Sequence, residues 1–117
     1  MLSIIAVDND KAYLSTLKKE VEKIGFKCTV TLTPEFVLEA FKINSYDLVI
    51  TDYKLARTTG LELINNLGRL SDNFKAIIIT DDEDFFINDS FKYKTKVITI
   101  IQKPVKYFIL KKILISL

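Results

Sequence analysis

Five short runs of apolar and β-branched residues alternate along the chain with amphipathic stretches of helical period. The runs predicted as strands are residues 2–7, 27–32, 48–51, 76–79 and 97–101. Most of them are apolar throughout, which is typical of strands buried on both faces of a parallel sheet. Strict alternation of strand and helix predicts a parallel sheet with helices on both faces. The predicted fold class is therefore α/β, a doubly wound (βα)5 arrangement with a five-stranded parallel sheet.

The predicted helices lie between and after these strands. They cover residues 11–24, 34–43, 60–67 and 83–91, and a last helix follows Lys103-Pro104 and ends at Leu117. Asp10 is suited to cap the first helix and Gly25 to end it. The segment Thr33-Pro34-Glu35 combines a hydroxyl cap with a proline at the first helical position. These capping signals support the first two predicted helices.

Length and composition narrow the class of protein. The chain has 117 residues, of which 49% are hydrophobic and 27% charged, and its net charge is +2. That length favours one domain spanning residues 1–117. No uncharged stretch exceeds seven residues, which is far short of the ~20 residues of a membrane-spanning helix. Asp8 and Asp10 interrupt the apolar opening too early for a signal peptide. We therefore expect a cytoplasmic protein that does not contact a membrane.

The scarce residue types exclude much chemistry. The chain has no histidine, which excludes Ser–His and Cys–His nucleophile pairs, imidazole acid–base catalysis and histidine-ligated zinc. Cys28 is the only cysteine, so neither a disulfide nor a thiolate metal cluster can form within one chain. The three glycines match neither a phosphate-binding loop nor a dinucleotide fingerprint. Carboxylate, hydroxyl and lysine chemistry remain.

Polar residues follow four of the five predicted strands. They are Asp8, Asn9 and Asp10 after the first strand, Asp52 after the third, Thr80 after the fourth and Lys103 after the fifth. Each alone can be explained as a helix cap, a loop acid or a surface lysine, but sites in open parallel sheets form beyond the carboxyl ends of strands. Clustered carboxylates are typically kept ionised by a hard cation such as Mg²⁺. A lysine and a hydroxyl beside that cation are suited to an anionic phosphoryl group.

Over its whole length the chain resembles the receiver domain of bacterial two-component response regulators. The markers are Val7-Asp8-Asn9-Asp10, the segment from Tyr46 to Asp52, Gly60 eight residues beyond Asp52, Thr80, and Lys103-Pro104. The resemblance implies the flavodoxin-like strand order 2-1-3-4-5. It implies a stand-alone receiver or one excised from a longer chain. It also implies a phosphoacceptor domain rather than an enzyme.

The resemblance assigns a role to each marker. Asp52 would be the phosphoacceptor and would attack a phosphohistidine on a partner histidine kinase or phosphotransfer protein. The magnesium ligands would be Asp8, Asn9, Asp52 and the backbone carbonyl of Lys54. Thr80 would hydrogen-bond a phosphoryl oxygen, and Lys103 would form an ion pair with the phosphoryl group. A cis bond between Lys103 and Pro104 would turn the lysine into the cleft.

Four positions depart from the family pattern. Asn9 stands where a second acid is usual, so Mg²⁺ binding is predicted to be weak. Asp81 occupies a position that is usually very small, where its charge opposes an incoming phosphoryl group. Ile100 stands at the switch position, where a tyrosine or phenylalanine is expected, so the aromatic rotation of the family is not available. Leu55-Ala56 replaces the usual Met-Pro, which is a mild change.

Two classes of function remain open. The first is a receiver that is phosphorylated, and the joint presence of Asp52, Thr80 and Lys103 favours it. The second is a pseudo-receiver, the same fold acting as an interaction module without phosphorylation. Flavin binding is disfavoured because no phosphate loop follows the first strand. Direct nucleic-acid binding is disfavoured because no recognition helix exists beyond the five that the sheet needs.

The last third of the chain is asymmetric in charge. Residues 81–89 contain five acids and no base, whereas residues 92–117 contain seven lysines and no acid. In the expected fold the fourth helix, fifth strand and fifth helix form one face. A two-fold axis through that face would set acid against base, which predicts a weak homodimer. The alternative is a solvated basic face with extra core residues.

Overall fold

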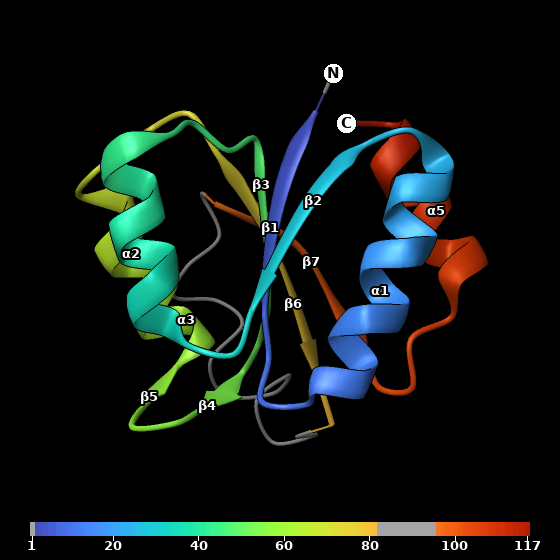
Figure 1. The fold of residues 1–117 in the computed structure, drawn as a ribbon, viewed down its shortest axis with the longest axis horizontal. Helices are drawn as coiled ribbons and strands as arrows, with labels where there is room; N and C mark the ends of the chain where they lie inside the picture. Colours follow the sequence, from blue (N-terminus) through green and yellow to red (C-terminus); the bar gives the residue numbers. More distant parts are fainter. Residues whose placement is uncertain (1, 82–95) are drawn as a thin grey trace.

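A five-stranded parallel sheet forms the centre of the computed structural model, which describes residues 2–81 and 96–117 (Figure 1). Its strands are β1 (Ser3–Val7), β2 (Lys27–Thr31), β3 (Leu48–Asp52), β6 (Lys75–Thr80) and β7 (Val97–Gln102). They lie in the order β2-β1-β3-β6-β7, and all neighbouring pairs are parallel. Counted as the five strands of the sheet, this is the predicted order 2-1-3-4-5. The predicted fold class is confirmed.

Helices cover both faces of the sheet. They are α1 (Lys11–Ile24), α2 (Pro34–Ile43), α3 (Gly60–Gly68) and α5 (Tyr107–Ile115). Figure 1 shows α1 and α5 on one face and α2 and α3 on the other. The last helix ends at Ile115, two residues before the predicted end, with Ser116 as its cap. The helix predicted for residues 83–91 lies outside the described residues. No helix in the two described segments is long and apolar enough to cross a membrane.

The predicted capping residues act as expected. The Asp10 side chain accepts a hydrogen bond from the backbone N–H of Tyr13 at 3.1 Å, and the Thr33 hydroxyl accepts one from Phe36 N at 3.3 Å. Gly25 ends α1 in the left-handed region with φ of 107°. A residue with a side chain would be strained in this backbone conformation. These caps fix where α1 and α2 begin, and therefore where the loops before them lie.

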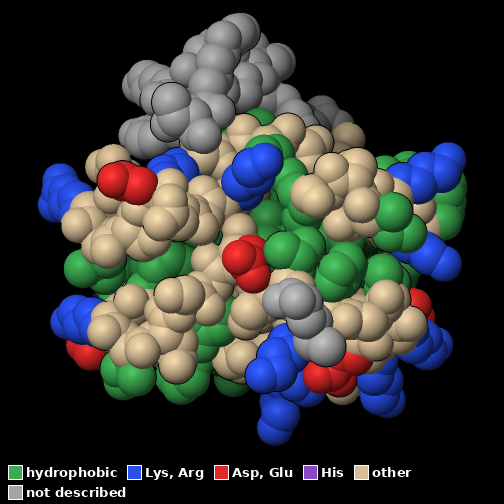
Figure 2. All heavy atoms as spheres, turned by 90° about the horizontal axis from the view of Figure 1, so that it is seen from above, with side chains coloured by type: hydrophobic (Ala, Val, Ile, Leu, Met, Phe, Trp, Pro, Cys, Tyr) green, Lys and Arg blue, Asp and Glu red, His purple; other side chains and the backbone are tan. Residues whose placement is uncertain are grey.

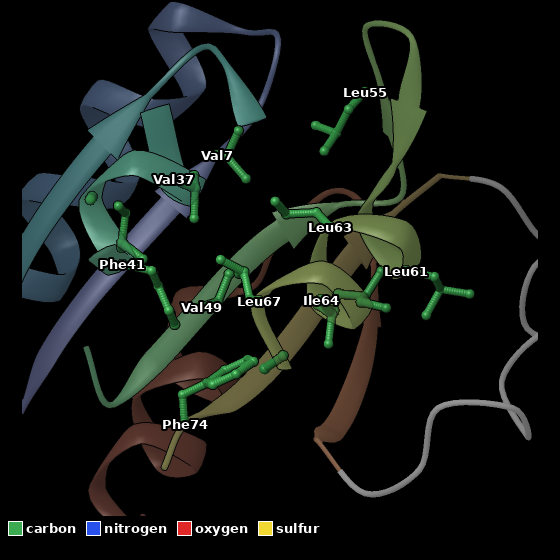
Figure 3. Close-up of a cluster of buried hydrophobic side chains, with 14 residues drawn as sticks. Val7, Val37, Phe41, Val49, Leu55, Leu61, Leu63, Ile64, Leu67 and Phe74 are labelled. Carbon is green, nitrogen blue, oxygen red and sulfur yellow. The ribbon is translucent and has the colours of Figure 1, made fainter. Parts of the chain in front are cut away.

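Two apolar clusters pack on opposite faces of the sheet. The cluster under α2 and α3 includes an edge-to-face pair of Phe41 and Phe74, whose ring centroids are 5.2 Å apart (Figure 3). The cluster under α1 and α5 includes Leu17 and Leu110, which are almost fully buried. Cys28 belongs to the second cluster, and burial raises the pKa of its thiol to about 11. The thiol is therefore protonated at neutral pH and serves as an apolar core group.

A short hairpin interrupts the connection between β3 and α3. The sequence predicts a loop here, but β4 (Lys54–Leu55) pairs antiparallel with β5 (Thr58–Thr59). The tight turn requires a positive φ, and Arg57 adopts it at 65°. Glycine or asparagine is the usual signal for such a turn, so the pattern of residues did not reveal it. Leu55 is 8% exposed and belongs to the cluster under α2 and α3, which anchors the hairpin.

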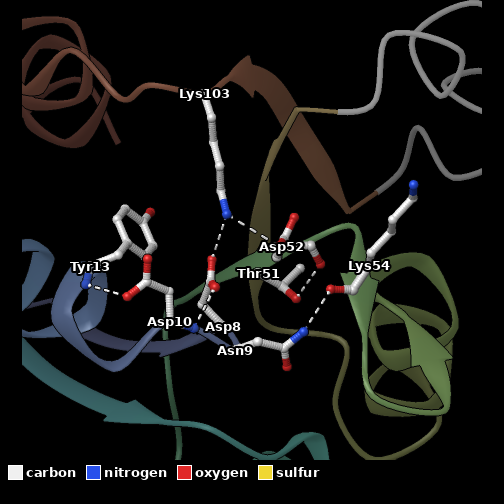
Figure 4. A network of polar contacts seen from close by, with 8 residues as sticks. All are labelled: Asp8, Asn9, Asp10, Tyr13, Thr51, Asp52, Lys54 and Lys103. Atoms are coloured by element: carbon white, nitrogen blue, oxygen red, sulfur yellow. Dashed lines mark hydrogen bonds and ion pairs between the residues drawn. The ribbon is translucent and has the colours of Figure 1, made fainter.

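Charged side chains occur at both edges of the sheet. Figure 2 views the amino-terminal edge, where Lys and Arg side chains project around the rim together with Asp and Glu side chains, and apolar side chains show between them. At the carboxyl-terminal edge, oppositely charged side chains from three strand ends contact one another (Figure 4). The candidate site therefore lies at the carboxyl-terminal edge, as the sequence predicts.

Candidate functional site

Two carboxylates and one ammonium group meet beyond the ends of β1, β3 and β7. The Nζ atom of Lys103 lies 3.0 Å from Asp8 Oδ2 and 3.2 Å from Asp52 Oδ2 (Figure 4). In the sequence Lys103 lies 95 positions from Asp8 and 51 positions from Asp52. The parallel sheet brings them to one point because all its strands end at the same edge. Lys103 therefore bridges the two acids.

Burial strengthens the electrostatic coupling in this group. The Asp8 side chain is 3% exposed, that of Asp52 13% and that of Lys103 26%. Desolvation raises the pKa of Asp52, and the nearby charge of Lys103 opposes that rise. Desolvation alone would lower the pKa of Lys103, but its hydrogen bonds and charge interactions with Asp8 and Asp52 outweigh it and raise the pKa. At neutral pH the lysine is charged and holds the two acids together.

Backbone contacts hold Asp8 in place. Its Oδ1 atom accepts a hydrogen bond from Asp10 N at 3.0 Å, and its own N–H donates to Thr31 O at 3.3 Å. The side chain of Asp10 caps α1 instead (Figure 4). Asp8 and Asp10, two positions apart in the sequence, thus have different roles: Asp8 contacts Lys103, and Asp10 caps α1.

Oxygen atoms suited to a hard cation lie beside the two acids. The Asn9 side-chain Nδ2 donates to the backbone carbonyl of Lys54 at 3.5 Å, so these two predicted ligands are neighbours (Figure 4). No group of three or more Asp, Glu, His or Cys side chains suited to a metal occurs within residues 2–81 and 96–117. Two carboxylates, an amide and a carbonyl fit Mg²⁺ by donor type. Their negative charge is low for such a site.

Thr80 lies at the same edge of the sheet. It is the last residue of β6, is fully buried, and its backbone carbonyl accepts a hydrogen bond from Lys103 N at 2.9 Å. This hydrogen bond joins the end of β6 to Lys103, the residue that follows β7. The Lys103–Pro104 bond is cis.

Comparison with known proteins identifies the family of this fold and site. Residues 4–114 match the family model described as the response regulator receiver domain. The chain belongs to that family. The receiver domain is 28% identical over 82 residues to the two-component response regulator PprB of Pseudomonas aeruginosa, covering 67% of this chain and 30% of PprB. It is 32% identical over 68 residues to the aerobic respiration control sensor protein ArcB of Escherichia coli, covering 58% of this chain. It spans only 9% of the length of ArcB.

Solved structures share the fold across the whole receiver domain. A CheY-like receiver domain from Methylobacillus flagellatus superposes with a TM-score of 0.88 at 23% identity, covering 99% of this chain and 98% of that one. The response regulator TrrA of Thermotoga maritima, solved in complex with Mg²⁺–BeF, gives a TM-score of 0.85 at 23% identity, again covering 99% and 98%. At this level of identity the likeness establishes the fold alone.

Two of the positions that depart from the family pattern lie in or next to β6 and β7. Asp81 is exposed and directly follows β6. Ile100 lies in β7 opposite Ile78 of β6 and packs partly buried against the cluster under α2 and α3. An aliphatic side chain is thus accommodated at the predicted switch position.

The sequence predicts no contact for three residues near the candidate site. The ring of Tyr13 lies 5.2 Å from Lys103 Nζ, and burial raises the pKa of its hydroxyl. The Thr51 hydroxyl donates to Asp52 O at 2.8 Å. The sequence marks Gly60 only by its spacing from Asp52, yet its N–H donates to Tyr53 O at 2.6 Å, which ties α3 to the residue after Asp52. No local sequence signal marks the contacts of Tyr13 and Gly60, because they depend on how loops and elements pack, whereas the contact of Thr51 joins adjacent residues.

Proposed function

We propose that this receiver domain accepts a phosphoryl group on Asp52 from a phosphohistidine of a histidine kinase or phosphotransfer protein. The observation that carries the proposal is the pairing of Lys103 with both Asp8 and Asp52 at the strand ends. Asp52 retains some exposure, so a donor can reach it. Membership of the family and the likeness to ArcB and PprB support a place in two-component signalling.

The chemistry follows from the charges at the site. A carboxylate oxygen of Asp52 attacks phosphorus, the phosphorus–nitrogen bond to the donor imidazole breaks, and a mixed anhydride forms on Asp52. Phosphoryl transfer depends mainly on alignment and charge neutralisation. Lys103 supplies positive charge beside the acceptor, and Thr80 is assigned a hydrogen bond to a phosphoryl oxygen. The histidine belongs to the partner, which agrees with its absence from this chain. The domain is an acceptor, not an enzyme acting on separate substrates.

Magnesium is the cofactor of this proposal. Its ligands would be the carboxylates of Asp8 and Asp52, the side chain of Asn9 and the carbonyl of Lys54. When bound, Mg²⁺ neutralises charge on the acceptor and the phosphoryl oxygens. The complex of TrrA with Mg²⁺–BeF supports this assignment.

We expect Asn9→Asp to tighten Mg²⁺ binding and to lower the stability of the metal-free protein. The added carboxylate attracts the cation but lies near Asp8, which repels it when no cation is present. Calorimetric titration with Mg²⁺ and thermal melting in a chelator measure the two effects. Asn9→Ser, which removes the amide without adding a charge, is the control. Unchanged affinity in Asn9→Asp would exclude position 9 from the coordination shell.

We expect incubation with acetyl phosphate and Mg²⁺ to add one phosphoryl group to the parent protein and none to Asp52→Asn. The amide keeps the shape of the side chain but is not a nucleophile. Intact-mass measurement reads the result directly. A modified Asp52→Asn would place the acceptor elsewhere. An unmodified parent at every Mg²⁺ concentration would favour the second candidate function.

That second candidate is a pseudo-receiver that binds partners without phosphorylation. Three departures favour it: Asn9 removes a negative charge from the metal site, Asp81 opposes an anionic donor, and Ile100 cannot act as an aromatic switch. The retained pair of Asp52 and Lys103 favours the phosphorylated receiver instead, because an interaction module does not need this buried ion pair. We infer that the protein is cytoplasmic and that this segment binds neither a membrane nor, directly, nucleic acid.

We also expect weak, salt-sensitive self-association, strengthened by phosphorylation. The described part of the proposed face includes exposed Phe108 and Ile115 on the basic helix α5. The acidic segment of residues 81–89 lies almost wholly outside the described residues. Sedimentation velocity at low and high salt, with and without acetyl phosphate, measures the association. A strict monomer under all four conditions would rule out the homodimer.

A further inference from the structure

The ammonium group of Lys103 has a third neighbour besides its two acids. The ring of Tyr13 faces it, with the ring centroid 5.2 Å from Nζ (Figure 4). A lysine ammonium has three N–H donors, and Asp8 and Asp52 accept two of them. An aromatic face attracts a cation at this distance, most strongly where water is partly excluded. The two carboxylates and the ring therefore enclose the ammonium from different directions.

Tyr13 is well fixed for this contact. It lies in the first turn of α1, and its backbone N–H donates to the capping side chain of Asp10 at 3.1 Å. Its ring packs partly buried against the apolar cluster under α1 and α5. Within residues 2–81 and 96–117, its hydroxyl is a buried side-chain polar atom without a hydrogen-bond partner. The contact with Lys103 is therefore made by the ring and not by the hydroxyl.

A hollow lies beside the ring of Tyr13 and offers space into which the Lys103 side chain could move. It has a volume of about 460 Å³ and is lined by Asp10, Tyr13, Lys103, Pro104, Val105 and Tyr107. Lysine has a long flexible side chain, and holding it in one rotamer costs entropy. A smaller residue at position 13 would widen the hollow and give Lys103 room to leave the two acids. Asp10 on the wall of the hollow offers a competing carboxylate.

We propose that Tyr13 is a positioning residue whose aromatic ring holds the Lys103 ammonium between Asp8 and Asp52. This inference rests on the proposed function, because the held ammonium is the group that neutralises the incoming phosphoryl group. Tyr13 itself does not touch the reacting atoms. It acts by keeping Lys103 out of the hollow.

The first test compares Tyr13→Leu with Tyr13→Phe in phosphorylation by acetyl phosphate and Mg²⁺. Tyr13→Leu keeps apolar bulk but removes the aromatic face, and we expect the rate at saturating acetyl phosphate to fall roughly fivefold. Tyr13→Phe keeps the face, and we expect it to stay within about twofold of the parent. Thermal melting shows whether each variant is folded, and Tyr13→Met replaces Tyr13→Leu if the latter is not. Equal rates in Leu and parent, or a Phe variant as slow as Leu, would overturn the proposal.

The second test needs no phosphorylation and uses the parent chain itself. We expect the ε-methylene protons of Lys103 to resonate upfield of those of lysines without an aromatic neighbour in NMR spectra, because the adjoining Nζ atom lies over the ring of Tyr13. Lys96, whose Nζ lies 4.7 Å from the ring centroid of Phe74, is expected to be shifted as well. Lys103→Met identifies the Lys103 signal, which should persist in Tyr13→Phe and move to the ordinary lysine position in Tyr13→Leu. If the parent accepts no phosphoryl group, the proposed function fails and this signal alone decides the role of Tyr13. An ordinary Lys103 shift in the parent would overturn it.

Discussion

We expect Gly60→Ala to destabilise the protein by about 2–3 kcal/mol. A Cβ atom at position 60 would lie against the carbonyl oxygen of Asp52 and 2.9 Å from Thr51 Cγ2. Backbone atoms at the end of a buried strand cannot move away cheaply. Urea denaturation of the parent and the variant measures the loss. Because the displaced carbonyl belongs to the proposed phosphoacceptor, we also expect slower phosphorylation at Asp52.

Gly68→Ala is the matched control for this substitution. Nothing lies within 4 Å of a Cβ atom built at Gly68, which is the last residue of α3. Alanine is favoured over glycine in helices, so we expect a gain of about 0.5–1 kcal/mol. A Gly60→Ala variant as stable as the parent would show that α3 can move away from β3 and that the close contact is not needed.

We expect Lys103→Met to destabilise the metal-free protein by about 2–3 kcal/mol at neutral pH. Methionine approximates the length of the aliphatic chain but removes the charge, which leaves the carboxylates of Asp8 and Asp52 buried close together. The loss of stability is smaller than for a fully buried ion pair, because 26% of the Lys103 side chain is exposed. Urea denaturation in the presence of a chelator measures it.

The pH dependence of this variant separates charge from packing. Burial already raises the pKa of Asp52 in the parent, and Lys103 limits that rise. Without Lys103 the pKa of Asp52 in the folded state is higher still. A carboxyl group with a raised pKa contributes stability below its unfolded-state pKa and loses it as the pH rises through the folded-state pKa. We therefore expect the difference between Lys103→Met and the parent to shrink as the pH falls towards about 4.

Lys42→Met provides the control for the loss of a lysine. Lys42 pairs with Glu39 at 3.2 Å, but the two side chains are 55% and 69% exposed. Exposed ion pairs contribute little, so we expect a change within about 0.5 kcal/mol at every pH. Equal losses in Lys103→Met and Lys42→Met would contradict the view that burial makes the Lys103 bridge important.

Much of the fold follows from local sequence patterns. The apolar runs ending at Asp8 and Thr80 are long enough to be strands and too continuous to face water, so they predict a covered parallel sheet. Asp10 and Gly25 bound the first helix with side-chain and backbone preferences that act over a few residues. The strand order followed from the family resemblance. For the strands and the first helix, the signal and the structure it specifies lie close together along the chain.

The contacts of the site could not be read in the same way. That Lys103 reaches both Asp8 and Asp52, and that Tyr13 faces Lys103, depends on the packing of α1 and the loop before α5 at one sheet edge. The β4–β5 hairpin was missed because Arg57 adopts the left-handed conformation without a glycine or asparagine to announce it. Sequence identifies which residue types gather at the edge, whereas three-dimensional packing decides which atoms meet.

The central claim is that Asp52 is the phosphoacceptor. Borohydride reduces an acyl phosphate to an alcohol, so treating the protein with it after incubation with acetyl phosphate and Mg²⁺ records where the phosphoryl group was attached. Peptide mass spectrometry then locates the reduced residue. We predict homoserine at position 52 and an unreduced Asp8. Reduction at Asp8, or at neither position in a protein that has gained a phosphoryl group, would contradict the assignment.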